Sequence, residues 1–215
     1  WNKKNELINE CNNAIIYNEK NADIYNYKSH CLMVLGRFEE AIESYRKCIS
    51  LNEEKNTIIN DEYFSIGYCY SKLKKYDEAI QNFEKGQKIY EKLIKSNFEQ
   101  GLKNCENGNP QDCLIQSHLV YLDLKNKFLD LDFYKGICFM ELEKYNDAIN
   151  CFDLCIKFDK KFSEAYYNKG LTYSKQNKSE EAIKQFKKAI YYNGKIEIYK
   201  EALKEEQNKL AKIQN

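Results

Sequence analysis

The residues best suited to chemistry in this sequence are two histidines and nine cysteines. A zinc site needs Cys and His ligands at short spacings, yet His30 and His118 lie far apart and no Cys-x-x-Cys pair occurs. Cys151 and Cys155 can share a helix face, and we interpret them as small core residues. The sequence therefore predicts no metal site and no cofactor, and unpaired buried thiols are typical of a reducing compartment.

Arrangements of residues that would support catalysis are also missing from the sequence. His30 and Cys31 are neighbours on one predicted helix, so their side chains point about 100° apart and cannot form a nucleophile–base pair. No glycine-rich phosphate loop, His-Glu-x-x-His or Gly-x-Ser-x-Gly motif occurs. The many carboxylates fall at helical spacing on solvated faces, without the paired setting that acid–base chemistry needs. We therefore predict that these residues form no enzyme and contain no catalytic residue.

Charge and composition exclude further classes of protein. Lys and Arg number 34 and Asp and Glu number 33, so the net charge of +1 provides no basic excess for nucleic acid or acidic lipid. No apolar run approaches the roughly 20 residues of a membrane-spanning helix. One proline and eight glycines disfavour a turn-rich β fold. We expect an all-α protein with no signal peptide and no membrane insertion, placed by default in the cytoplasm, with cytoskeletal, ciliary and organellar complexes left open.

Four stretches of the chain repeat one pattern. They are centred on Ala41, Ala79, Ala148 and Ala182, at intervals of 38, 69 and 34 residues. A small residue stands twelve positions before each alanine and a large one nine positions before it. In order these are Ser29, Gly67, Gly136 and Gly170, and Leu32, Tyr70, Phe139 and Tyr173. Apolar residues three or four apart indicate two helices per unit, joined by a polar turn. Such short pairs bury both faces only by stacking on one another.

This pattern resembles the tetratricopeptide repeat, a 34-residue unit with small residues at positions 8, 20 and 27 and large ones at positions 4, 11, 17 and 24. Position 24 holds Tyr45, Phe83, Phe152 and Phe186, and position 17 holds Phe38, Tyr76 and Tyr145. Asp132 at position 4, Ser179 at position 17 and the missing proline at position 32 depart from the pattern. The register also places Cys31, Cys69, Cys138, Cys48 and Cys155 at small, buried positions. The resemblance implies an α-α superhelix, a solenoid of antiparallel helix pairs.

The same register divides the chain into segments. Complete units are expected at 22–55, 56–93, 129–162 and 163–196, with the second helix of an earlier unit at 1–21. Residues 197–215 are expected to form a C-terminal capping helix. The irregular segment 94–128 is expected to contain the end of a long helix from Asp77 to about Glu106, a turn at Asn107–Pro110 and a helix from about Gln111 to Lys127.

The resemblance implies that the first helices line a concave groove, in which positions 2, 5, 9, 12 and 13 are exposed. Position 2 is acidic in all four units, and the middle of the groove is apolar and aromatic. The predicted partner-binding residues are Asp23, Asn26, His30, Met33, Asp61, Phe64, Tyr68, Lys72, Asp130, Phe133, Ile137, Met140, Glu164, Tyr167 and Leu171. Such aromatics serve as anchors, so the expected partner is a protein peptide or helix with apolar anchors and basic residues. Two alternatives stay open: the aromatics extend the core, and the acids only cap helix starts.

The expected function is a non-catalytic protein–protein interaction scaffold or adaptor, a subunit of a multiprotein complex. The alternative is a targeting or regulatory module of an enzyme whose catalytic part lies outside these residues. Co-chaperone members of the family grip chaperone tails with Lys and Asn at positions 5 and 9, where Asn26 and His30 stand here. Asp130 and Tyr134 stand where later Lys and Arg are needed, so we expect no chaperone tail. The acidic groove likewise argues against an RNA-binding repeat.

Overall fold

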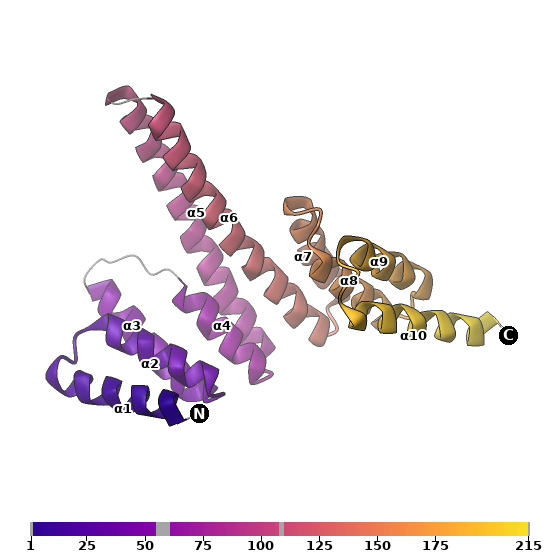
Figure 1. Ribbon diagram of the computed structural model, residues 1–215, viewed down its shortest axis with the longest axis horizontal. Coiled ribbons are helices and arrows are strands. Elements are labelled where there is room, and N and C mark those ends of the chain that lie inside the picture. Colours follow the sequence, from indigo (N-terminus) through magenta and orange to yellow (C-terminus); the bar gives the residue numbers. More distant parts are fainter. Residues whose placement is uncertain (1, 55–60, 108–109, 215) are drawn as a thin grey trace. The chain divides into compact units, whose positions relative to one another are not determined.

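The computed structural model describes residues 2–54, 61–107 and 110–214, and these residues form ten α-helices and no strand (Figure 1). The helices are α1 (Asn2–Tyr17), α2 (Ala22–Val34), α3 (Phe38–Glu54), α4 (Glu62–Lys72), α5 (Tyr76–Asn107), α6 (Pro110–Glu141), α7 (Tyr145–Phe158), α8 (Ser163–Lys175), α9 (Ser179–Tyr192) and α10 (Glu197–Gln214). The expected all-α fold is confirmed. The chain divides into an N-terminal body, Trp1–Lys125, and a C-terminal body, Asn126–Asn215, and the division falls within α6.

Every repeat turns between its two helices at a residue with positive φ. These are Gly36 (77°), Lys74 (58°), Glu143 (59°) and Asn177 (58°), all at position 15 of the repeat. The next amide donates to the carbonyl five residues earlier, as from Arg37 to Leu32 at 2.9 Å and from Lys178 to Tyr173 at 3.0 Å. This left-handed closure satisfies carbonyls at the end of the first helix and lets the chain reverse without a proline.

The core of each helix pair forms where a small residue meets an aromatic ring. Tyr45, Phe83, Phe152 and Phe186 at position 24 are at most 1% exposed. A Cβ atom built onto Gly67 would lie 2.5 Å from Cε1 of Phe83, and one on Gly170 would lie 2.6 Å from Cε1 of Phe186. The first helix therefore approaches the ring so closely that only glycine fits without a shift, which explains the small residues of the sequence pattern.

Two helices extend well beyond the repeat pattern. Helices α5 and α6 each contain 32 residues, and α6 continues without a break into the first helix of the repeat at 129–162. We expected the helix after Pro110 to end near Lys127. It continues because no glycine or proline stands between Pro110 and Gly136 to interrupt it. The expected turn at Asn107–Pro110 includes residues 108–109, which lie outside the described residues, as does the connection at 56–59.

Within the C-terminal body, α10 packs along one face against α8 and the start of α9. Tyr199 is 2% exposed, and its ring centroid lies 4.8 Å from that of Tyr167 on α8. Its hydroxyl lies 3.4 Å from Oγ of Ser163. Seven residues further along α10 stands Glu206, on the same face, because seven residues are close to two helical turns. Two contacts therefore hold α10, one aromatic and one polar, and they lie two helical turns apart.

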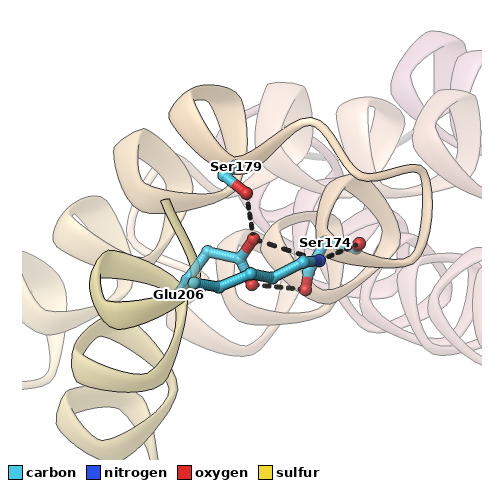
Figure 2. A network of polar contacts seen from close by, with 4 residues as sticks. Ser174, Ser179 and Glu206 are labelled. Atoms are coloured by element: carbon cyan, nitrogen blue, oxygen red, sulfur yellow. Dashed lines mark hydrogen bonds and ion pairs between the residues drawn. The ribbon is translucent and has the colours of Figure 1, made fainter. Parts of the chain in front are cut away.

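The polar contact is a network around the buried carboxylate of Glu206 (Figure 2). Its Oε2 accepts a hydrogen bond from Oγ of Ser174 at 2.5 Å, and its Oε1 accepts one from Oγ of Ser179 at 2.6 Å. Nζ of Lys209 lies 3.5 Å from Oε1 and donates to the carbonyl of Ser174 at 3.1 Å. Burial alone would raise the pKa of Glu206, but the two hydroxyls and the ammonium outweigh it and leave this pKa below its usual value.

Candidate functional site

We call positions 2, 5, 9, 12 and 13 of each first helix, which are predicted to be exposed, its stripe. On the N-terminal body, the stripe of α2 borders a small hollow. The hollow has a volume of about 180 Å³ and is lined by Asp23, Asn26, Tyr27 and His30. The Asp23 side chain is exposed, and Nδ1 of His30 lies 3.1 Å from the hydroxyl of the buried Tyr45. Oδ1 of Asn26 is buried and has no hydrogen-bond partner in the described part of the chain. An unpartnered acceptor beside a carboxylate attracts an N–H or cationic donor.

The stripe on α4 is half-buried and aromatic. The ring of Phe64 lies 6.0 Å from that of Phe83, centroid to centroid, so it rests on the core of its own repeat. Nζ of the exposed Lys72 lies 5.0 Å from the ring centroid of Tyr68. This ammonium covers the ring face and offers a positive charge beside it. On α2, Met33 is partly buried and packs against the core.

The acidic residues at position 2 have different surroundings. Asn21, not Asp23, caps α2, since its Oδ1 accepts the Asp23 amide at 3.0 Å. The carboxylate of Asp61 accepts the hydroxyl of Tyr90. Glu164 accepts the Ser163 hydroxyl at 2.9 Å. Asp23 is therefore an exposed acid that does not cap its helix, whereas Asp61 and Glu164 are tied to neighbouring side chains.

The stripe of α6 in the C-terminal body lies largely within side-chain packing. Phe133 is half-buried, and its ring centroid is 5.0 Å from that of Phe162. Ile137 also packs against the core, and Asp130 is exposed. Met140, expected on the exposed stripe, is only 5% exposed. It packs in the core with residues of α7 and α8, so we leave it out of the surface considered below.

The stripe of α8 is covered in part by α10. The ring centroid of Tyr167 is 5.8 Å from that of Phe186 and 4.8 Å from that of Tyr199. Leu171 is partly buried against the core formed around Met140. In this body the predicted aromatics therefore make the contacts that the alternative interpretation, an extension of the core, describes.

The sequence analysis missed the polar contact between Glu206 of α10 and the start of α9. Ser179 could have indicated it, because this small polar residue stands at position 17, where the other three repeats carry Phe38, Tyr76 and Tyr145. A hydroxyl in place of a ring needs a polar partner when it is buried. Glu206 supplies that partner, at a distance of 2.6 Å.

Two findings concern chemistry that the described residues lack. Across 2–54, 61–107 and 110–214, no group of three or more His, Cys, Asp or Glu residues is placed to hold a metal ion. Over the same ranges, none of the helices combines the length and apolar content that a membrane crossing demands.

The fold places this chain among helical-repeat proteins built from antiparallel helix pairs. The structure is similar to the crystal structure of MamA, with a TM-score of 0.62 at 18% identity over 87% of both chains. It is also similar to BtubC (BKLC) from P. vanneervenii, with a TM-score of 0.59 at 14% identity over 90% of this chain and 72% of that one. At these identities the similarity concerns the fold alone.

Residues 22–55, 61–93 and 163–195 match the models of the tetratricopeptide repeat family. Together with the fold, these matches show that the chain is a tetratricopeptide repeat protein. Human DnaJ homolog subfamily C member 7 is 25% identical over 200 residues, which are 86% of this chain and 40% of that protein. The chain thus spans about two fifths of the length of this relative. Tetratricopeptide repeats form protein-interaction modules and generally act as scaffolds without catalysis.

Proposed function

We propose that this chain is a non-catalytic scaffold or adaptor that binds a protein segment along the first helices of its repeats, within a larger cytoplasmic assembly. One observation carries the proposal: the hollow on α2, where the exposed Asp23 carboxylate stands beside the unpartnered Oδ1 of Asn26. A buried acceptor without a donor costs about 1–3 kcal/mol, which a ligand donor would recover on binding. The family supports the same class of function.

The chemistry of the hollow specifies the partner. A Lys or Arg side chain supplies both the cation that Asp23 attracts and the N–H that Asn26 lacks. On the neighbouring repeat, the half-buried Phe64 and Tyr68 provide aromatic surface for an apolar anchor. The expected ligand is therefore a peptide or helix with a basic residue beside an apolar one.

Affinity capture with variants tests this assignment. Asp23→Lys combined with Asn26→Ala reverses the charge of the hollow and removes its acceptor, and should abolish capture of the proteins that the unchanged chain retains. Glu43→Lys changes an exposed acid of α3 that does not line this hollow; it is the matched control and should capture them all. Far-UV circular dichroism checks that both variants fold. Equal capture by the double variant would overturn the assignment.

The same hollow disfavours the acidic tail of a chaperone. A free C-terminal carboxylate would meet Asp23 and the Asn26 carbonyl oxygen, both of which repel it. Titration with an acidic peptide that ends in a free carboxylate should therefore leave the backbone amide signals of α2 unchanged. Saturable shifts at Asn26 and His30 would contradict this exclusion.

A second candidate is a targeting module joined to an enzyme in a longer protein. The human relative supports only the greater length that this candidate needs, because the matched part is 40% of that protein. The sequence of the full-length transcript tests it: a catalytic motif beyond these residues would support it, and an open reading frame limited to repeats would exclude it.

A further inference from the structure

A cavity of about 240 Å³ lies between α3, α4 and α5 of the N-terminal body, and its walls include Arg46, Tyr63, Tyr70, Glu78, Gln81 and Lys85. At about 100° per residue, Tyr63 and Tyr70 fall on the side of α4 opposite to Tyr68 and Lys72. The cavity is therefore separate from the stripe to which the proposed function assigns the partner.

Two cations are held at the wall of this cavity by aromatic rings. Nη2 of Arg46 donates to the hydroxyl of Tyr70 at 2.6 Å, and the guanidinium carbon lies 6.0 Å from the centroid of that ring. Nζ of Lys85 lies 5.8 Å from the ring centroid of Tyr63. Neither cation forms an ion pair with any carboxylate in the described ranges, although Glu78 also lines the cavity. Since a guanidinium has five N–H donors, Arg46 keeps several of them available.

The equivalent place in the C-terminal body differs at one charged position. There the tyrosines are Tyr166 and Tyr173, and Lys188 lies over Tyr166 as Lys85 lies over Tyr63. The position of Arg46, number 25 of the preceding repeat, is taken by Asp153. Nζ of Lys169 lies 2.5 Å from its carboxylate. In the C-terminal body an ion pair thus occupies this place, whereas in the described part of the N-terminal body neither Arg46 nor Lys85 is ion-paired.

We propose that the Arg46–Lys85 cavity binds an oxyanion carried by a side chain of a protein partner, either a carboxylate or a phosphate. The Arg46 fork and the Lys85 ammonium donate charge-assisted hydrogen bonds to its oxygens. The Gln81 amide offers a further donor, and the rings of Tyr63 and Tyr70 contact the aliphatic part of the same side chain. This site goes beyond the proposed function, because it lies on another face and takes a ligand of opposite charge.

Nuclear magnetic resonance of the ¹⁵N-labelled full chain, at constant ionic strength and pH 7, tests the site with three blocked tripeptides. They carry a central glutamate, phosphoserine or glutamine. The readout is the Nε–H signal of the two arginines of the chain. Arg37 is the internal control, because Glu40 holds its guanidinium at 2.6 Å through two bonds. Saturable shifts at Arg46 but not at Arg37, with glutamate, phosphoserine or both, support the site and identify the group.

Variants decide whether the two cations act as described. Arg46→Gln and Lys85→Gln should each weaken binding about tenfold, as expected for loss of one charge-assisted bond. The affinity of Arg46→Lys should lie between those of Arg46→Gln and the unchanged chain, since lysine keeps the charge but lacks the paired N–H donors of the guanidinium. Lys188→Gln, the matched lysine of the C-terminal body, should have no effect. Equal shifts at both arginines, shifts with the glutamine peptide, or unchanged affinity in the Arg46 and Lys85 variants would overturn the proposal.

The two proposals fail independently. Asp23→Lys with Asn26→Ala should bind the tripeptides as the unchanged chain does. Arg46→Gln should still capture proteins that depend on the hollow of α2. Loss of tripeptide binding in the α2 double variant would contradict a separate site, whatever the outcome of the capture experiment.

Discussion

Glu206→Gln should release α10 from α8 and α9. The carboxylate accepts hydrogen bonds from Ser174 at 2.5 Å and Ser179 at 2.6 Å. Two charged hydrogen bonds of about 1.5–3 kcal/mol each are offset by about 1–3 kcal/mol for desolvating the acid. The net loss is about 2–3 kcal/mol, or about 30- to 150-fold in the opening equilibrium of the helix.

Hydrogen exchange measured by mass spectrometry is the assay. Peptides from α10 should exchange faster by this factor in Glu206→Gln at pH 7, whereas peptides from α2 and α3 should be unchanged. Glu205→Gln, an exposed neighbour, is the control and should behave as the unchanged chain. Exchange of α10 within threefold of that chain, or an equal effect of Glu205→Gln, would refute the reasoning.

The pH dependence of the same variant has a defined sign. The pKa of Glu206 in the folded chain lies below its unfolded value, since the hydrogen bonds and Lys209 outweigh burial. Its contribution to stability is therefore present above the unfolded pKa of about 4.3 and is lost as the pH falls through the lower folded value. The difference in urea-unfolding free energy between the unchanged chain and Glu206→Gln should shrink in acid. A difference that stays constant down to pH 3 would contradict this linkage.

Three further predictions concern the repeats. Gly67→Ala should lower the unfolding free energy by about 1–2 kcal/mol in urea titration, because the methyl group at 2.5 Å from the Phe83 ring outweighs the gain in helix propensity; an unchanged midpoint would contradict it. Glu143→Gly should raise the unfolding free energy, measured by thermal unfolding, by about 0.5–1 kcal/mol, because glycine adopts the positive φ without strain. Gly36→Ala should lower it, although the added Cβ meets no atom within 4 Å, because Gly36 also has a positive φ. A change of the same sign in both variants would contradict this reasoning. Burial strongly raises the pKa of the thiols of Cys48, Cys69, Cys138 and Cys155, so iodoacetamide at pH 8 should spare them in the native chain and label them in urea.

The helix pairs could be predicted from the sequence because their determinants are local. Gly67 and Phe83 stand 16 residues apart in one hairpin, and the same pair of types recurs at the same spacing in other repeats. The continuous α6 was missed at Lys127 because a change of repeat register does not by itself end a helix. A helix ends where the backbone is interrupted, and that stretch contains no interrupting residue.

The surface was harder to predict, because it depends on what the next helix does. Phe133 and Tyr167 occupy the same repeat position as Phe64, yet Tyr167 lies against Tyr199 of α10. Periodicity identifies a face of a helix but not the length or orientation of the helix that covers it. The Arg46–Lys85 cavity was missed for the same reason, since its two cations come from successive repeats.

The contact between Ser179 and Glu206 also makes the order of helices specific. At the start of α3 the same position holds Phe38, which packs against the cluster that contains Cys69 of the following helix. At the junction of α3 and α4, an apolar ring packs against a cluster that contains a thiol. At the junction of α9 and α10, a hydroxyl donates to a carboxylate. The two junctions differ in polarity, so their halves do not match. If α10 followed α3, the ionised Glu206 would lie against the phenyl ring of Phe38. The polar start of α9 is therefore matched to α10, whereas the apolar start of α3 is matched to α4.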